Sequence, residues 1–153
     1  GGGLPSCALI EAFPQARFAL IERGERRVEF LRWMVNELGA EDRATVVQAE
    51  VEVAARDAHL GCAATLVTAR SFAPPAVTAE CACRFLVIGG TLLVSEPPED
   101  TRRWSSRWLG TLGLELGQRM AARGFMFQSL ERTAEPEARF PRRPGVPRKR
   151  PLW

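Results

Sequence analysis

The 153-residue sequence contains no tyrosine and only one histidine, His59. Its four cysteines, Cys7, Cys62, Cys81 and Cys83, include no Cys-x-x-Cys pair. Because a zinc site needs about four nitrogen or sulfur ligands at characteristic spacings, we expect no metal site. The cysteines are instead expected to be buried thiols in a reducing compartment.

Long apolar runs are also absent. The longest, residues 85–94, is interrupted by two glycines and is far shorter than the roughly 20 residues that span a bilayer. The chain opens on glycine rather than methionine, without a charged start and an apolar run, so we expect the interior of a longer reading frame and no secretory signal. These features predict a soluble, cytoplasmic protein, taken here as a monomer.

A length of 153 residues with 46% hydrophobic content suits one domain, expected over residues 1–135. Residues 136–153 are expected to form a basic tail. Within it, residues 139–150 hold six positive charges and no acid: Arg139, Arg142, Arg143, Arg148, Lys149 and Arg150. Removing these six charges from the net charge of +3 leaves −3, so the tail predicts an anionic partner. The alternative is a solvated, disordered end.

Hydrophobic periodicity predicts alternating strands and helices, and hence a mostly parallel α/β sheet. We expect strands at 18–22, 44–48, 63–69 and 91–95, and helices at 24–39, 50–58, 76–85 and 101–112, with a turn at 89–90. Residues 114–121 and 125–133 suit an antiparallel pair, although the first also suits a helix. Ligands of such sheets bind at the carboxyl ends of the strands, which gathers Glu22, residues 48–52, residues 70–72 and Ser95-Glu96 along one edge.

The first residues, Gly1-Gly2-Gly3-Leu4-Pro5-Ser6, run directly into a helical segment and the strand at 18–22. Glycines allow a positive φ and let a ligand lie against the backbone, so this stretch is typical of a phosphate- or nucleoside-binding loop. The carboxylate of Glu22 then suits two ribose hydroxyls. A flexible linker is the alternative interpretation of the glycines.

Five segments together resemble a known family. They are Gly1-Gly2-Gly3-Leu4-Pro5, residues 19–22, residues 26–32, Arg70-Ser71-Phe72-Ala73, and residues 139–152 with their Pro-Arg-Arg-Pro-Gly element. In this order they resemble the bacterial small-subunit (16S) ribosomal RNA guanine-N7 methyltransferases, methyltransferase G, also called glucose-inhibited division protein B. The resemblance implies a Rossmann-like, class I methyltransferase that uses S-adenosylmethionine and acts on 16S ribosomal RNA or the small ribosomal subunit.

The resemblance also implies roles for individual residues. The cofactor-binding residues are expected to be Gly1, Gly3, Leu4, Glu22, Val51, Glu52 and Arg70. For RNA binding the expectation is Arg142, Arg143, Arg148, Lys149 and Arg150, acting as a salt-sensitive clamp on phosphates. No catalytic residue is assigned, because guanine N7 already presents a lone pair and needs no base to deprotonate it.

The sequence departs from the family at several places. The family has a glycine where Ser6 stands, a basic residue at Glu50, and in many members Lys-Gly where this chain has Ser95-Glu96. The family's first strand and the helices before it have no counterpart, so we expect a fragment whose neighbouring strands, near Phe18 and Thr65, have unpaired backbone groups. Two rival functions therefore remain: a non-catalytic RNA-binding remnant, and a methyltransferase for a small molecule.

Overall fold

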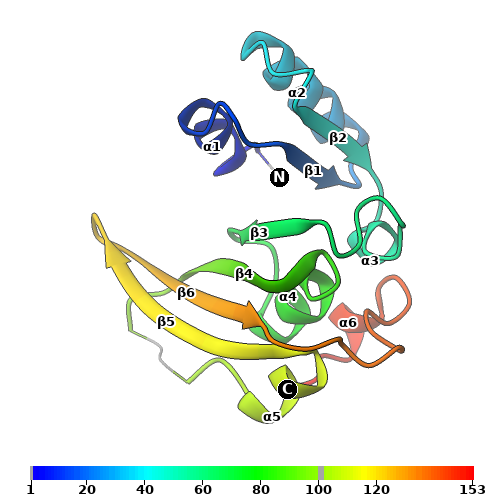
Figure 1. Ribbon diagram of the computed structural model, residues 1–153, viewed down its shortest axis with the longest axis vertical. Helices are drawn as coiled ribbons and strands as arrows, with labels where there is room; N and C mark the ends of the chain where they lie inside the picture. Colours follow the sequence, from blue (N-terminus) through cyan, green and yellow to red (C-terminus); the bar gives the residue numbers. More distant parts are fainter. Residues whose placement is uncertain (1, 100–101) are drawn as a thin grey trace. The chain divides into compact units, whose positions relative to one another are not determined.

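The computed structural model describes residues 2–99 and 102–153. The chain divides into two compact units, Gly1–Ala54 and Ala55–Trp153, each with its own sheet (Figure 1). Among the helices of the described residues, none is both long and apolar enough to cross a membrane.

The first unit is a short βαβ arrangement. Its elements are α1 (Ser6–Ala12), β1 (Phe18–Glu22), α2 (Glu25–Glu37), β2 (Ala44–Gln48) and α3 (Val51–Ala54). Strands β1 and β2 pair in parallel, with Glu22 opposite Gln48 at their carboxyl ends. Helix α2 buries the apolar face that its periodicity predicts, including Val28, Leu31 and Val35. This face packs with Ile10 and Leu20 into a small core.

The second unit carries a mixed sheet. Its elements are β3 (Ala64–Ala69), α4 (Pro75–Ala82), β4 (Leu86–Glu96), α5 (Ser106–Thr111), β5 (Leu114–Ala122), β6 (Phe125–Arg132) and α6 (Val146–Lys149). The strand order is β3-β4-β6-β5, with β3 and β4 parallel and the other two pairings antiparallel (Figure 1). Of the two interpretations of residues 114–121, the structure selects the strand.

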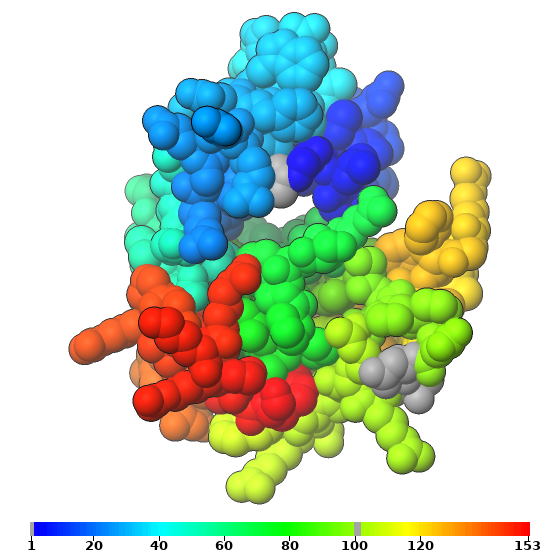
Figure 2. Space-filling model, turned by 180° about the vertical axis from the view of Figure 1, so that it is seen from behind, coloured from blue at the N-terminus to red at the C-terminus, as the bar shows by residue number. Residues whose placement is uncertain are grey.

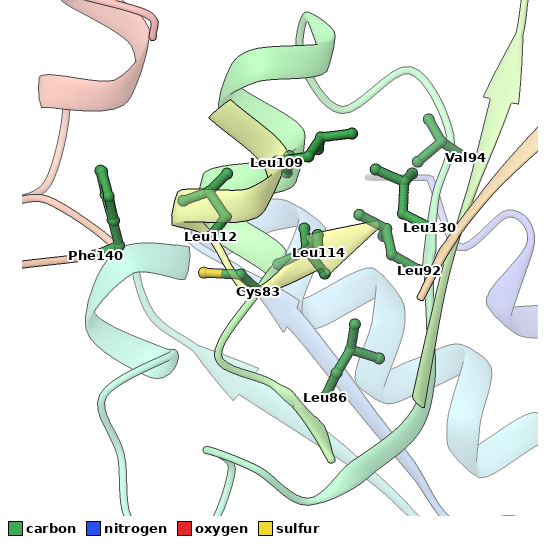
Figure 3. Close-up of a cluster of buried hydrophobic side chains, with 11 residues drawn as sticks. Cys83, Leu86, Leu92, Val94, Leu109, Leu112, Leu114, Leu130 and Phe140 are labelled. Atoms are coloured by element: carbon green, nitrogen blue, oxygen red, sulfur yellow. The ribbon is translucent and has the colours of Figure 1, made fainter. Parts of the chain in front are cut away.

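The core of the second unit joins the sheet to α4, α5 and the tail. Figure 3 shows the cluster formed by Cys83, Leu86, Leu92, Val94, Leu109, Leu112, Leu114, Leu130 and Phe140. Burial raises the pKa of the Cys83 thiol to about 12, so this cysteine behaves as an apolar core residue. Phe140, within the predicted tail, is fully buried in the same cluster.

Four local predictions are wrong. Gly89 and Gly90 lie inside β4 rather than in a turn before it. Glycine is required at this irregularity of the strand, because Gly89 takes φ +80° and a Cβ on Gly90 would lie 3.0 Å from the Ala64 carbonyl oxygen. The predicted helix at 50–58 ends at Ala54, and the predicted helix at 101–112 covers only Ser106–Thr111. Residue 101 itself lies outside the described residues. Cys62 is exposed, although we expected a buried thiol.

Four strands of the described chain, β1, β2, β3 and β5, pair on one side only, and two of them were expected to do so. Strand β1 pairs only with β2, and β3 pairs only with β4. These are the two strands, near Phe18 and Thr65, for which the sequence predicted unpaired backbone groups. The prediction is confirmed for the described residues.

The tail is ordered against its own unit. The guanidinium of Arg142 binds Glu80 of α4, and the guanidinium of Arg84 donates to the carbonyl oxygen of Phe140. The indole N–H of Trp153 donates to the Arg103 carbonyl oxygen over 2.9 Å. In Figure 2 the tail (orange to red) lies against the green part of this unit, which includes α4. The alternative of a disordered tail is therefore wrong for these residues.

Candidate functional site

Glu22 stands at the carboxyl end of β1 and is largely buried. Its Oε1 accepts hydrogen bonds from the backbone N–H groups of Arg23, at 2.9 Å, and Gly24, at 2.8 Å. The Arg27 guanidinium lies 3.3 Å away. Burial alone would raise the pKa of Glu22, but the donors and positive charges around it, including Gly24 and Arg27, outweigh burial and lower the pKa. The carboxylate is thus ionised and fixed in position at neutral pH.

The other predicted cofactor residues of the first unit lie either at the start of α3 or in the N-terminal glycine stretch. Val51 and Glu52 begin α3, which packs against β1, and the Ala49 N–H donates to the Glu22 carbonyl oxygen over 3.1 Å. These residues therefore share the carboxyl edge of the parallel pair with Glu22. Glu52 is buried and Val51 half-buried.

The glycine stretch has a packing role in this structure. Gly3 takes φ +82°, and a Cβ there would lie 2.9 Å from the Met34 sulfur of α2. Both facts favour glycine independently of any ligand. Leu4 is exposed, and Gly1 lies outside the described residues. Cofactor binding by Gly1, Gly3 and Leu4 stays a prediction.

In the second unit, the carboxyl ends of β3 and β4 form one wall of a cavity of about 390 Å³. Arg70, which follows β3, lines it and is exposed to solvent. Phe72 and Phe125 line it as well, with 36% and 61% of their surface exposed. The cofactor role of Arg70 stays a prediction, since Arg70 belongs to a different unit from Glu22.

Glu96, the last residue of β4, also lines this cavity. Its side chain is only 3% exposed, and its Oε2 pairs with the Arg103 guanidinium at 3.0 Å. The other oxygen, Oε1, is buried and accepts no hydrogen bond from the described residues. A buried carboxylate oxygen without a donor is unusual in a folded protein and needs an explanation.

The predicted RNA-binding residues differ in their surroundings. Arg142 binds the buried Glu80 through its backbone N–H and its guanidinium, and hydrogen bonding to Glu80 raises the pKa of Arg142. Arg148 lies over the Phe72 ring, with its guanidinium carbon 5.6 Å from the ring centre. Arg143, Lys149 and Arg150 are exposed. Arg142 has a structural partner, whereas the last three are open to an anionic ligand.

Sequence reasoning placed Glu96 at the carboxyl edge of the sheet and noted it as a departure from the family, but it did not identify Arg103 or Phe125 as site residues. Arg103 reaches Glu96 across seven positions, and Phe125 joins the cavity only because β6 pairs with β4 so that Met126 faces Glu96. The one sequence signal for this site was a glutamate at the end of a predicted strand, and it gave no information about which residues would contact that glutamate.

The family comparison decides the assignment of the chain. Residues 1–101 match the profile of the family "rRNA small subunit methyltransferase G". The chain belongs to this family. Ribosomal RNA small subunit methyltransferase G of Geobacillus thermodenitrificans is 32% identical over 99% of this chain and 67% of the relative. The protein of the same name from Rubrobacter xylanophilus is 33% identical over 99% of this chain and 62% of the relative.

The chain spans about two thirds of the length of these methyltransferase G relatives. Solved structures support the fold. An S-adenosylmethionine-dependent methyltransferase, SibL, matches with a TM-score of 0.65 at 20% identity over 88% of this chain and 48% of that one. The antibiotic-resistance methyltransferase Kmr matches with a TM-score of 0.61 at 18% identity over 86% and 84%. The predicted class I methyltransferase fold, with a mixed sheet, is confirmed.

Proposed function

We propose that this methyltransferase G chain transfers the methyl group of S-adenosylmethionine to N7 of a guanine in small-subunit ribosomal RNA. The family match over residues 1–101 is the observation that carries the proposal. We further propose that it acts as a cytoplasmic monomer on 16S ribosomal RNA or the small ribosomal subunit.

The residues at the carboxyl edge of β1 and β2 fit a nucleoside cofactor. Glu22 is an ionised carboxylate that the Arg23 and Gly24 N–H groups hold in place, and carboxylates at this position in Rossmann-like folds accept hydrogen bonds from ribose hydroxyls. Val51 and Glu52 lie at the same edge and would line the adenosine. S-adenosylmethionine supplies an electrophilic methyl group bound to a sulfonium.

Methylation of guanine N7 requires little acid–base catalysis by the protein. N7 of guanine carries an in-plane lone pair, so no side chain has to remove a proton before transfer. The protein's contributions are alignment of N7 with the methyl group and electrostatic support as positive charge moves to the base. This accords with a sequence that has one histidine and no tyrosine.

The test is methyl transfer from radiolabelled S-adenosylmethionine to 16S ribosomal RNA and to small subunits, with cofactor affinity measured by calorimetry. We expect E22Q to weaken cofactor binding about tenfold or more, because one carboxylate oxygen and the charge are lost. E29Q, which changes an exposed glutamate of α2, is the matched control. Absence of heat on titration with S-adenosylmethionine would favour the RNA-binding remnant.

The small-molecule alternative needs a different variant. Deleting residues 139–153 would remove the buried Phe140 and damage the fold. Alanine at the exposed Arg143, Lys149 and Arg150 leaves that core intact. Loss of activity that grows with salt supports an RNA substrate, whereas unchanged activity supports a small molecule.

A further inference from the structure

The buried oxygen of Glu96 lies beside the cavity at the carboxyl ends of β3 and β4. Removing a carboxylate oxygen from water without a hydrogen-bond donor is costly, and the described residues offer Oε1 no donor. Oε2, by contrast, is held by Arg103, whose own carbonyl oxygen accepts from the Trp153 indole. Among the described residues, the carboxylate therefore has a donor at Oε2 and none at Oε1, which indicates a ligand that brings a donor to Oε1.

The walls of the cavity indicate a flat, aromatic ligand. Phe72 and Phe125 line it and keep 36% and 61% of their surface exposed. Exposed aromatic side chains beside a polar, buried group are the usual platform for a stacked nucleobase. Arg70 lines the same cavity and is exposed, so a cation is available for the attached phosphate.

Among the four RNA bases, guanine matches an acceptor of this kind best. Its Watson–Crick edge presents two adjacent donors, N1–H and the 2-amino group. Adenine and cytosine each place a ring-nitrogen acceptor beside their amino group, and uracil flanks its single N–H with two carbonyl acceptors. A carboxylate oxygen accepts two hydrogen bonds, so it attracts the guanine edge and repels an acceptor.

We propose that this cavity receives the target guanine, whose Watson–Crick edge donates to Oε1 of Glu96 while its ring packs on Phe72 and Phe125. The proposal rests on the proposed function and names the residue that selects the base. Because Oε1 is buried, the entering base displaces a covering side chain. N7 lies on the opposite side of the purine from N1 and the 2-amino group, so this binding mode leaves it open to the methyl donor.

Four short single-stranded RNAs test the proposal. They differ only at one central base, which is guanine, 7-deazaguanine, inosine or adenine, and binding to the full chain is measured by fluorescence anisotropy. We expect guanine and 7-deazaguanine to bind equally, inosine less well, and adenine about tenfold or more weakly. Equal binding of guanine and adenine would overturn the proposal.

Variants assign the selectivity to Glu96. E96Q keeps the side-chain shape but has one acceptor oxygen and no charge, so the preference for guanine over adenine should fall to near unity. F125A should weaken all four RNAs by a similar factor, about tenfold, and keep the preference. E131Q, an exposed glutamate of β6, is the control and should change neither. If E96Q and wild type show the same preference, Glu96 does not select the base.

Methyl transfer separates this inference from the proposed function. Selective binding that depends on Glu96, without methylation of the guanine RNA or of the small subunit, would support the inference and refute the N7 methyltransferase. If guanine RNA is methylated and 7-deazaguanine RNA is not, and E96Q binds guanine RNA over adenine RNA with the same preference as wild type, the proposed enzyme is supported and the inference is refuted.

Discussion

Two buried glutamates of the second unit have opposite surroundings. Glu80, in α4, is fully buried, and its Oε1 accepts from the Arg142 backbone N–H and Nε, both at 2.8 Å, while its Oε2 binds the Arg142 Nη2 at 2.6 Å. Glu96, at the end of β4, binds Arg103 through one oxygen only, and its other oxygen has no donor among the described residues.

The contrast separates a structural carboxylate from one available to a ligand. Buried ions are tolerated when their oxygens find donors, and both oxygens of Glu80 have them while the residue holds the tail on α4. Glu96 has a donor at only one oxygen among the described residues, so part of the free-energy cost of its desolvation is left uncompensated until a ligand binds. The same residue type in one core thus serves two purposes, and the number of donors tells them apart.

The largest effect is expected at Glu80. E80Q removes the charge and one acceptor oxygen at the fully buried end of this pair and leaves the Arg142 guanidinium without its counter-charge, so the free energy of unfolding should fall by about 3 kcal/mol. Urea denaturation followed by tryptophan fluorescence measures it. E131Q, at an exposed position, should stay within about 0.5 kcal/mol of wild type. Equal stability of E80Q and wild type would show that the pair does not hold the tail.

The tail gives the next effect. Alanine at Arg143, Lys149 and Arg150 should reduce RNA affinity and lower the slope of log affinity against log salt by about 2 for single-stranded RNA. R142A should instead lower stability, since its guanidinium serves Glu80. R107A, at an exposed position of α5, is the control. An unchanged salt slope in the triple variant would remove the tail from the RNA-binding surface.

The sequence predicted much of this fold because local signals and tertiary structure agree. The β-branched run at 44–48 and the helical period after Gly24 each produced an element with the expected limits within a residue or two. The glycine pair at 89–90 misled, since a bulge and a turn have the same local signature. Glu80 and Glu96 could not be distinguished at all, because their arginine partners lie 62 and 7 residues away and only the fold brings them together.

Glu22 is a third buried glutamate, in the first unit, and its contribution to stability can be measured through the pH dependence of unfolding. Its pKa is lowered in the folded state, below the ordinary value of 4.5, so the folded chain binds fewer protons there than the unfolded chain. Its stabilising effect is complete above the unfolded pKa and is lost as the pH falls through the lower folded value. We expect the unfolding free energy of wild type to fall more steeply below about pH 4.5 than that of E22Q. Parallel curves would contradict this, and E29Q should follow wild type.

The smallest change in the free energy of unfolding is expected for substitution of Glu96, the carboxylate that we assign to ligand binding. E96Q removes a carboxylate oxygen that no described residue satisfies, and the remaining amide oxygen can still accept from Arg103. The lost ion pair and the relieved desolvation nearly cancel, so the unfolding free energy should change by less than about 1 kcal/mol. Measured beside E80Q in the same urea series, the identical substitution should separate the two sites by about 2 kcal/mol or more. If E96Q destabilises the protein as much as E80Q does, Glu96 is a structural ion like Glu80, and the cavity beside it loses its reason to bind a base.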